Sequence, residues 1–199
     1  MRSDSSRDGR RRLLFALGLS VFDLTLARLA RAQADGVPIG VQAGLLAKVA
    51  AFDRNFASRA GSRAVVLVAA RPDDTESKRA ALEMTAALSA LPNIGGVPHQ
   101  VEVVHYAGAP ALAEAVRTKR AAIVYFGPGF EKQIGAIRDV LTSVSVLTVG
   151  ALPGYVPDGL VLGFDLVSSR PKLVINLTQA KKQHVAFPAS VLNLMRVHS

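Results

Sequence analysis

The chain of 199 residues has a formal net charge of +9, is half hydrophobic, and contains no cysteine and no tryptophan. This length fits one domain, and the hydrophobic content excludes a chain that is disordered throughout. The absence of cysteine excludes disulfides, thiolate nucleophiles, thiolate zinc sites and iron–sulfur clusters. Because no run of about 18 clean apolar residues is present, we expect no membrane-spanning helix.

Residues 1–34 have the order basic, apolar, small that is typical of a secretory signal. Five arginines precede an apolar run at residues 13–22, and Ala32-Gln33-Ala34 is a small-x-small cleavage site. Arg11-Arg12 also resembles a twin-arginine signal. An amphipathic helix at a membrane surface is the alternative. We predict that residues 1–34 are a signal peptide, that the protein is exported, and that residues 35–199 form a single domain.

The first part of this domain alternates helices and strands. Apolar residues spaced three and four apart predict a helix at residues 37–56. Further helices are predicted at 75–91, 110–120 and 130–141, and strands at 63–70, 99–106, 121–126 and 143–149. Three successive strand–helix–strand units predict an α/β fold with a largely parallel sheet and helices on both faces.

The pattern changes after Gly150. Strands are predicted at 160–167 and 172–177 with no helix between them, so they should form an antiparallel hairpin. A final helix follows, interrupted near Pro188 and continuing through Met195.

Residues with catalytic chemistry are sparse. No pair among His99, His105, His184 and His198 has the spacing of a two-histidine metal clamp. Asp73-Asp74 is predicted to cap a helix, and Glu131 to lie in the first turn of one. We therefore predict no catalytic residue, no metal, no cofactor and no enzymatic activity.

Two loops at strand ends are candidate ligand sites. The turn Gly127-Pro128-Gly129 follows a predicted parallel strand, where α/β sheets bind ligands, but a tight structural turn explains it as well. In the loop at residues 152–159, two prolines restrict the backbone and Gly154 and Gly159 permit positive φ. Tyr155 could form an aromatic wall there and Asp158 a polar contact. Packing of Tyr155 on the edge of the core is the equal alternative.

The remaining basic residues are spread along the chain in short pairs, without interleaved aromatic residues. Binding of nucleic acid usually requires a concentrated basic patch or stacking platforms. We interpret these charges as solvated surface and expect no nucleic-acid partner.

An ordered series of short motifs resembles the YfiR/HmsC family of periplasmic proteins. The motifs are Thr148-Val149-Gly150, Gly154-Tyr155, residues 159–164, residues 173–177 and residues 188–194. Residues 45–52 are similar to the family's first helix. The resemblance therefore covers about residues 37–197, and the predicted export signal agrees with it independently.

The resemblance implies a non-enzymatic periplasmic regulator. Better-known members bind the periplasmic part of an inner-membrane diguanylate cyclase and hold it inactive, which keeps cyclic di-GMP and biofilm formation low. Two features depart from the family: Asp53-Arg54-Asn55-Phe56 stands where a Trp-Pro is usual, and redox control through cysteines cannot operate. Phe52 and Phe56 are candidate partner-binding residues, although core packing explains them equally well.

Two functional hypotheses follow. The first is an exported repressor of an inner-membrane signalling protein such as a diguanylate cyclase. The second is a periplasmic protein that binds or senses a small molecule, with the candidate ligand residues Gly127, Gly129, Gly154, Tyr155 and Asp158. The hydrophobic first helix is compatible with a homodimer under either hypothesis.

Overall fold

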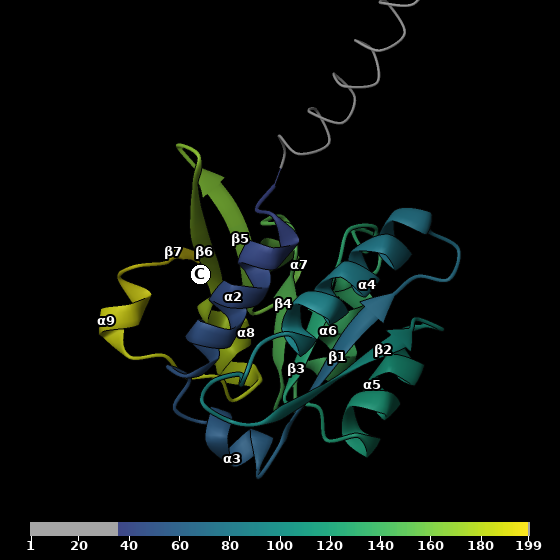
Figure 1. The fold of residues 1–199 in the computed structure, drawn as a ribbon, viewed down its shortest axis with the longest axis horizontal. Helices are drawn as coiled ribbons and strands as arrows, with labels where there is room; N and C mark the ends of the chain where they lie inside the picture. Colours follow the sequence, from purple (N-terminus) through teal and green to yellow (C-terminus); the bar gives the residue numbers. More distant parts are fainter. Residues whose placement is uncertain (1–35, 199) are drawn as a thin grey trace, which may run out of the picture. The chain divides into compact units, whose positions relative to one another are not determined.

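The computed structural model describes residues 36–198, so the predicted signal peptide lies outside the described residues. Strands and helices alternate along most of this part (Figure 1). The helices are α2 (Ile39–Ala50), α3 (Phe56–Ala60), α4 (Thr75–Ser89), α5 (Ala109–Thr118), α6 (Ile134–Leu141), α7 (Tyr155–Asp158), α8 (Leu177–Lys182) and α9 (Ala189–Leu192). The strands are β1 (Ala64–Ala70), β2 (His99–His105), β3 (Ile123–Phe126), β4 (Leu147–Gly150), β5 (Leu162–Val167), β6 (Arg170–Asn176) and β7 (Arg196–His198). No helix in this described part is long and apolar enough to cross a membrane.

These strands form one sheet in the order β2-β1-β3-β4-β5-β6-β7. Neighbouring strands from β2 to β5 are parallel. β6 runs antiparallel to β5, from the pair Leu162–Ile175 to the pair Val167–Arg170, and β7 pairs in parallel with β6. The structure therefore confirms the predicted α/β fold with a largely parallel sheet and an antiparallel hairpin.

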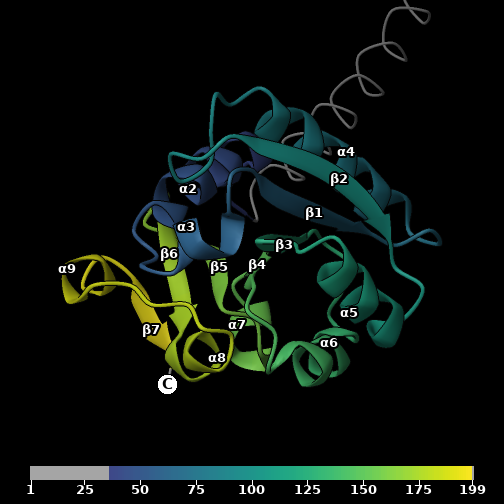
Figure 2. The ribbon, with the colours of Figure 1, turned by 90° about the horizontal axis from the view of Figure 1, so that it is seen from below.

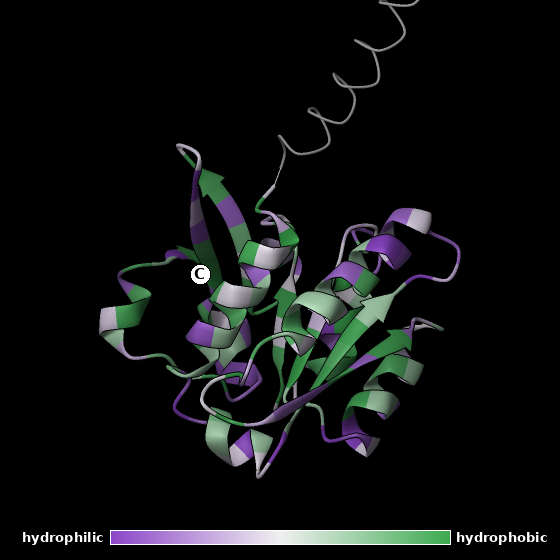
Figure 3. Ribbon diagram, in the orientation of Figure 1, coloured by the Kyte–Doolittle hydropathy of each residue, from purple (hydrophilic) through white to green (hydrophobic). Residues whose placement is uncertain are grey.

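Helices cover both faces of the sheet. Along β1, Val66 and Val68 pack into one core with α2 and α4, whereas Leu67 and Ala69 pack into a second core with α5 and α6. Figure 2 shows α2 and α4 on one side of the sheet and α5 and α6 on the other. Strands that are buried on both faces need apolar residues at every position. The central strands in Figure 3 are accordingly hydrophobic along their length.

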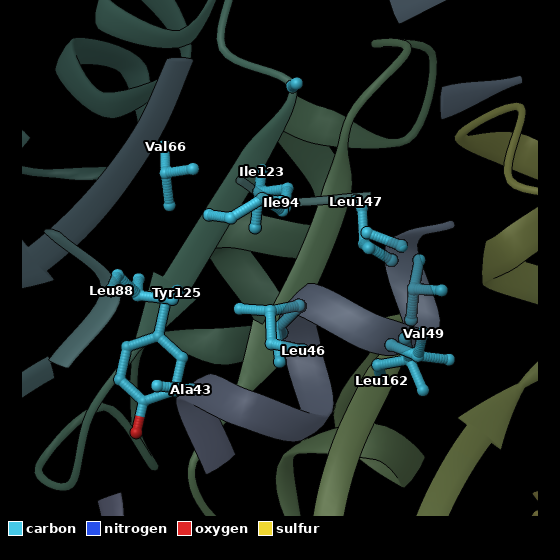
Figure 4. Close-up of a cluster of buried hydrophobic side chains, with 14 of the residues drawn as sticks. Ala43, Leu46, Val49, Val66, Leu88, Ile94, Ile123, Tyr125, Leu147 and Leu162 are labelled. Atoms are coloured by element: carbon cyan, nitrogen blue, oxygen red, sulfur yellow. The ribbon is translucent and has the colours of Figure 1, made fainter. Parts of the chain in front are cut away.

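The core beneath α2 combines tight apolar packing with a buried polar contact (Figure 4). Leu46 and Val49 of α2 are buried among the side chains of the central strands. The hydroxyl of Tyr125 donates a hydrogen bond to Gln42 Oε1 at 2.8 Å, and Gln42 Nε2 donates to the carbonyl of Val37 at 2.7 Å. Burial raises the pKa of Tyr125 far above its ordinary value, so its hydroxyl stays neutral. These bonds satisfy the buried polar groups and fix α2 on the sheet.

The helix predicted at residues 37–56 ends at Ala50, and a separate helix, α3, begins at Phe56. Between them, the Asp53 carboxylate accepts a hydrogen bond from the Ala186 N–H at 2.9 Å, and the Arg54 N–H donates to the Ala186 carbonyl at 2.9 Å. These contacts with a segment distant in sequence replace the bonds that a continuous helix would make. The local spacing of apolar residues carries no information about them.

Two further elements differ from the predictions. The loop at residues 152–159 contains the short helix α7, and Gly154 precedes it with φ −64°, whereas Gly159 has φ +128°. α9 begins after Pro188 as predicted but ends at Leu192, so the prediction of helix through Met195 is wrong. The chain turns there and adds β7 to the sheet beside β6.

Candidate functional site

The carboxyl ends of β1 and β3 meet at a switch point of the sheet. β1 lies between β2 and β3, and the helices that follow β1 and β3 pack on opposite faces. Ligands of open α/β sheets bind in the crevice between such diverging connections. The Gly127-Pro128-Gly129 turn follows β3 and so lies at the carboxyl edge of the sheet, as the sequence predicts; the structure places this edge at the switch point.

Arg71 joins the two loops at the switch point. Its Nη1 atom donates a hydrogen bond to the Gly129 carbonyl at 2.7 Å, and its Nη2 atom binds the Asp73 carboxylate. The Arg71 guanidinium holds the pKa of Asp73 below its ordinary value. Asp74 accepts a bond from the Ser77 N–H at 2.9 Å, which confirms the predicted cap of α4. Asp73 and Asp74 therefore have separate partners and do not act as a carboxylate pair.

Gly129 is required by the close approach of these loops. Its φ is +92°, and a Cβ atom there would lie 2.6 Å from Asp74 Oδ2. Only glycine satisfies both constraints without strain. The helix predicted from Phe130 begins instead at Ile134, so Glu131 lies in a turn and not in the first turn of a helix. No helix N-terminus follows the Gly127-Pro128-Gly129 turn directly.

Tyr155 connects this turn to the loop after β4. Its hydroxyl accepts a hydrogen bond from the Phe130 N–H at 3.0 Å and donates to Glu131 Oε1 at 3.0 Å, with the Gly127 carbonyl 3.3 Å away. The side chain is buried, and burial raises the pKa of Tyr155 above its ordinary value. Tyr155 therefore stays protonated near neutral pH. It acts as a hydrogen-bonding bridge between two strand ends.

We expect Tyr155→Phe to lower the free energy of unfolding by about 1–3 kcal/mol, because the Phe130 N–H loses its partner inside the core. Tyr106→Phe is the matched control, since its hydroxyl makes no hydrogen bond within residues 36–198 and should change stability by about 0.5 kcal/mol or less. Urea denaturation of both variants measures the difference. Equal stabilities would contradict a structural role for the Tyr155 hydroxyl.

The other predicted site residues are dispersed. Gly154 and Asp158 are exposed at the two ends of α7, and the Asp158 carbonyl accepts a hydrogen bond from Arg138 Nη1 at 3.4 Å. Phe52 follows α2 and is 52% exposed, whereas Phe56 is 2% exposed. The Phe56 ring packs closely on Gly95: a Cβ atom added to Gly95 would lie 2.5 Å from a carbon of the ring. Among the predicted partner-binding residues, only Phe52 presents a surface.

The polar groups of the candidate site interact mainly within the protein. Within residues 36–198, no three His, Cys, Asp or Glu side chains converge on a metal position. His99, one of the four histidines considered, uses its Nε2 atom to contact the Leu88 carbonyl at 2.9 Å. Gly127, Gly129 and Tyr155 come together, but their polar groups already have partners. The Tyr155 hydroxyl lies 3.3 Å from the Gly127 carbonyl, and the Gly129 carbonyl accepts a hydrogen bond from Arg71. The candidate site is thus a closed, hydrogen-bonded junction of strand ends.

A groove at the opposite edge of the sheet was not predicted from the sequence. It has a volume of about 600 Å³ and is lined by basic side chains that include Arg59, Arg117 and Arg120. Arg59 comes from α3, whereas Arg117 and Arg120 come from the end of α5 and the turn after it, so their convergence is a property of the fold. Arg120 belongs to the basic pair Lys119-Arg120, whose charges are expected from the sequence to be solvated surface.

Solved structures with a similar fold share little sequence with this chain. A conserved domain protein from Vibrio cholerae has a TM-score of 0.58 at 12% identity, with 81% of this chain and 60% of that chain covered. The ligand-free, open structure of CD0873, a substrate binding protein from Clostridium difficile, has a TM-score of 0.50 at 11% identity, with coverages of 73% and 57%. The ABC domain in complex with L-Trp from Streptococcus pneumonia has a TM-score of 0.53 at 14% identity, with coverages of 75% and 62%. The chain spans about 60% of their length, and the likeness establishes the fold alone.

The family comparison gives a more specific result. The comparison with curated proteins yields no match. The family model described as YfiR/HmsC-like matches residues 40–196, which is nearly all of the described part. The match supports a periplasmic, regulatory and non-catalytic role at the level of the family. The chain therefore belongs to the YfiR/HmsC-like family.

Proposed function

We propose that this protein is exported and represses an inner-membrane signalling partner, such as a diguanylate cyclase, by binding its periplasmic domain. The observation that carries the proposal is the family match over residues 40–196. The predicted signal peptide and the family's periplasmic location point to the same compartment. Repression by binding requires no catalytic group. The hydroxyl of Tyr155 at the strand ends is engaged in hydrogen bonds within the protein, which is consistent with such a role.

The mechanism is conformational. A protein that binds the inactive arrangement of a partner more tightly than the active one shifts the partner toward inactivity. A tenfold shift in that equilibrium requires about 1.4 kcal/mol of differential binding energy. A stimulus that favours dissociation would then restore the synthesis of cyclic di-GMP.

Exposed apolar side chains provide a surface for this contact. Val41 of α2 and Phe52, two residues beyond its end, are large hydrophobic residues that are exposed. The segment after Phe52 is fixed by a hydrogen bond from the Arg54 N–H to the Ala186 carbonyl. A large aromatic residue at a protein surface is the kind of group that dominates binding energy when a partner buries it. We assign Phe52 to the partner-binding surface on this basis.

Deletion of the gene should raise cellular cyclic di-GMP, and the full chain expressed from a plasmid should reverse the rise. Expression of residues 35–199 without the predicted signal should not reverse it, because the protein would not reach the periplasm. Phe52→Ser should restore repression poorly, whereas Leu82→Ser, which removes an exposed leucine on α4, should restore it fully. Quantification of cyclic di-GMP in the parent, the deletion strain and the four complemented strains tests the proposal. An unchanged level on deletion would argue against a cyclase as the partner.

A second function, binding of a small molecule, has separate support. One similar fold is described as a substrate binding protein and another as a complex with L-Trp. The candidate ligand residues Gly127, Gly129, Gly154, Tyr155 and Asp158 all lie at the carboxyl edge. Because the polar groups of Gly127, Gly129 and Tyr155 are already hydrogen-bonded, a ligand would have to displace these bonds or bind beside them, at the exposed Gly154 and Asp158. A thermal-shift screen of amino acids and vitamins with the purified chain tests this, because a ligand of the folded state must stabilise it. The absence of any shift would count against this function and leave the first untouched.

A further inference from the structure

Neither function uses the groove at the amino ends of the parallel strands. Its walls come from α3, the end of α5, the loop before β4 and the turn after α8. Ala121 and Ser145 line it, and each lies two residues before the start of a central strand, β3 or β4. The groove therefore lies at the opposite edge of the sheet from the junction at Tyr155. Figure 1 shows α3 at this end, away from the arrowhead of β1.

The groove has an excess of positive charge. Arg59, Arg117 and Arg120 line it, together with His184, and no aspartate or glutamate is among its lining residues. Asp53 pairs with Arg59, so the excess comes from Arg117 and Arg120. Arg117 and Arg120 form no ion pair with any residue of the described part. Lys119 lies between them in sequence but is paired with Glu102 at 2.6 Å. Two guanidinium groups are thus left available to a ligand.

Arg59 is held rigidly at the base of this charge cluster. Its side chain is 4% exposed, and its Nη1 atom donates to Asp53 Oδ2 at 2.8 Å. Its Nη2 atom donates to the His184 carbonyl at 3.0 Å, and its Nε atom to Ser145 Oγ at 3.4 Å. These bonds join three walls of the groove through one buried cation. Such preorganisation lowers the ordering cost of binding.

Two residues of the groove occupy backbone positions that favour glycine. Arg120 has φ +50° and His184 has φ +55°, each just after a helix. The Ala121 N–H donates a hydrogen bond to the Val116 carbonyl at 2.9 Å, and the Val185 N–H donates one to the Ala180 carbonyl at 2.8 Å. Such bonds, from the second residue beyond the C-cap back to the last turn, are typical of helix ends. Glycine is the easiest residue at this position because it lacks a Cβ atom. In this protein the two positions are occupied by Arg120 and His184, and both side chains line the groove.

We propose that this groove binds a small organic anion that carries a phosphate or carboxylate group. Guanidinium groups bind both oxyanions through paired hydrogen bonds, so Arg117 and Arg120 contact the anionic group. Val116 and Val144 provide apolar wall for its carbon skeleton. A volume of about 600 Å³ is typical of small-molecule sites. The proposal does not depend on repression of a signalling partner.

Isothermal titration calorimetry of the purified full chain with pyrophosphate and with citrate tests the proposal at a fixed salt concentration near 0.15 M. We expect saturable binding of at least one probe with a Kd below about 1 mM. Preference for pyrophosphate would identify a phosphate ligand, and preference for citrate a carboxylate ligand. Saturation by neither probe would overturn the proposal.

A double variant separates loss of the site from loss of the fold. Arg117→Gln with Arg120→Gly removes both free guanidinium groups, and glycine suits the φ of position 120. We expect binding to weaken about tenfold or more, with no fall in the melting temperature. Arg170→Gln with Lys172→Gln removes the same charge from the β5–β6 hairpin and should leave binding unchanged. An equal loss in both double variants would show attraction by overall charge and would overturn the site.

Discussion

Phe56→Ala should lower the free energy of unfolding by about 3–5 kcal/mol, which is the usual effect of truncating a buried phenylalanine. Phe56 begins α3, is 2% exposed, and packs on Gly95. Its removal leaves a cavity between α3 and the rest of the first core. Urea denaturation should show a lower midpoint with an unchanged m-value, because the surface exposed on unfolding is nearly the same.

Phe52→Ala is the matched control for this experiment. It removes the same side chain four residues earlier, where the ring is 52% exposed, and should change stability by about 0.5 kcal/mol or less. If partner binding needs Phe52, the control variant should be stable and defective in repression. A destabilisation of Phe52→Ala as large as that of Phe56→Ala would contradict the division of the pair into surface and core residues.

This pair shows what sequence can and cannot distinguish. Phe52 and Phe56 share one apolar stripe at helical spacing, so both are predicted to face the same way. The helix in fact ends at Ala50, and Phe56 begins a new helix after a turn. The turn depends on contacts between Asp53, Arg54 and Ala186, which no local pattern reveals.

Local patterns predict most of the sheet well. The strands β1 and β3 are short apolar runs bounded by turn residues, and such runs stay apolar because both faces are covered. β2 is a valine-rich strand at the edge of the sheet and is only partly buried. The β5–β6 hairpin is predicted because two strands follow each other without a helix. β7 is a different case: its three residues gain their strand geometry only by pairing with β6. Its sequence is too short and too polar to indicate a strand.

The sequence predicts where the candidate site lies better than it predicts how the residues of the site interact. Gly127 and Gly129 follow a parallel strand, and that alone places them at the carboxyl edge. The hydrogen bonds between Tyr155 and that turn join residues that are 25 to 28 positions apart, so spacing could not reveal them. The basic groove was missed because Arg59, Arg117 and His184 come from distant segments. The one local signal is Arg120, an arginine that ends a helix where glycine is usual.

Asp53→Asn should be as destabilising as Phe56→Ala, with a loss of about 3–5 kcal/mol, because it leaves a buried charge without its partner. The Asp53 side chain is fully buried and that of Arg59 is 4% exposed, with 2.8 Å between Asp53 Oδ2 and Arg59 Nη1. Asp53 also accepts hydrogen bonds from the Asn55 and Ala186 N–H groups at 3.1 and 2.9 Å. Glu102→Gln is the control, since its pair with Lys119 is exposed and should contribute about 1 kcal/mol or less.

A second variant distinguishes the ion pair from simple loss of hydrogen bonds. Arg59→Met in the Asp53→Asn background removes the unpaired cation, so part of the lost stability should return if the buried charge is the main cost. No recovery would mean that the backbone bonds to Asn55 and Ala186 carry the effect. Either result is informative about the groove. Asp53 holds Arg59 in place through the ion pair, and its bond to the Ala186 N–H holds the neighbouring turn that contains His184. The Asp53–Arg59 pair would then fix Arg59, the Ser145 loop and the turn at His184 relative to one another at one edge of the sheet.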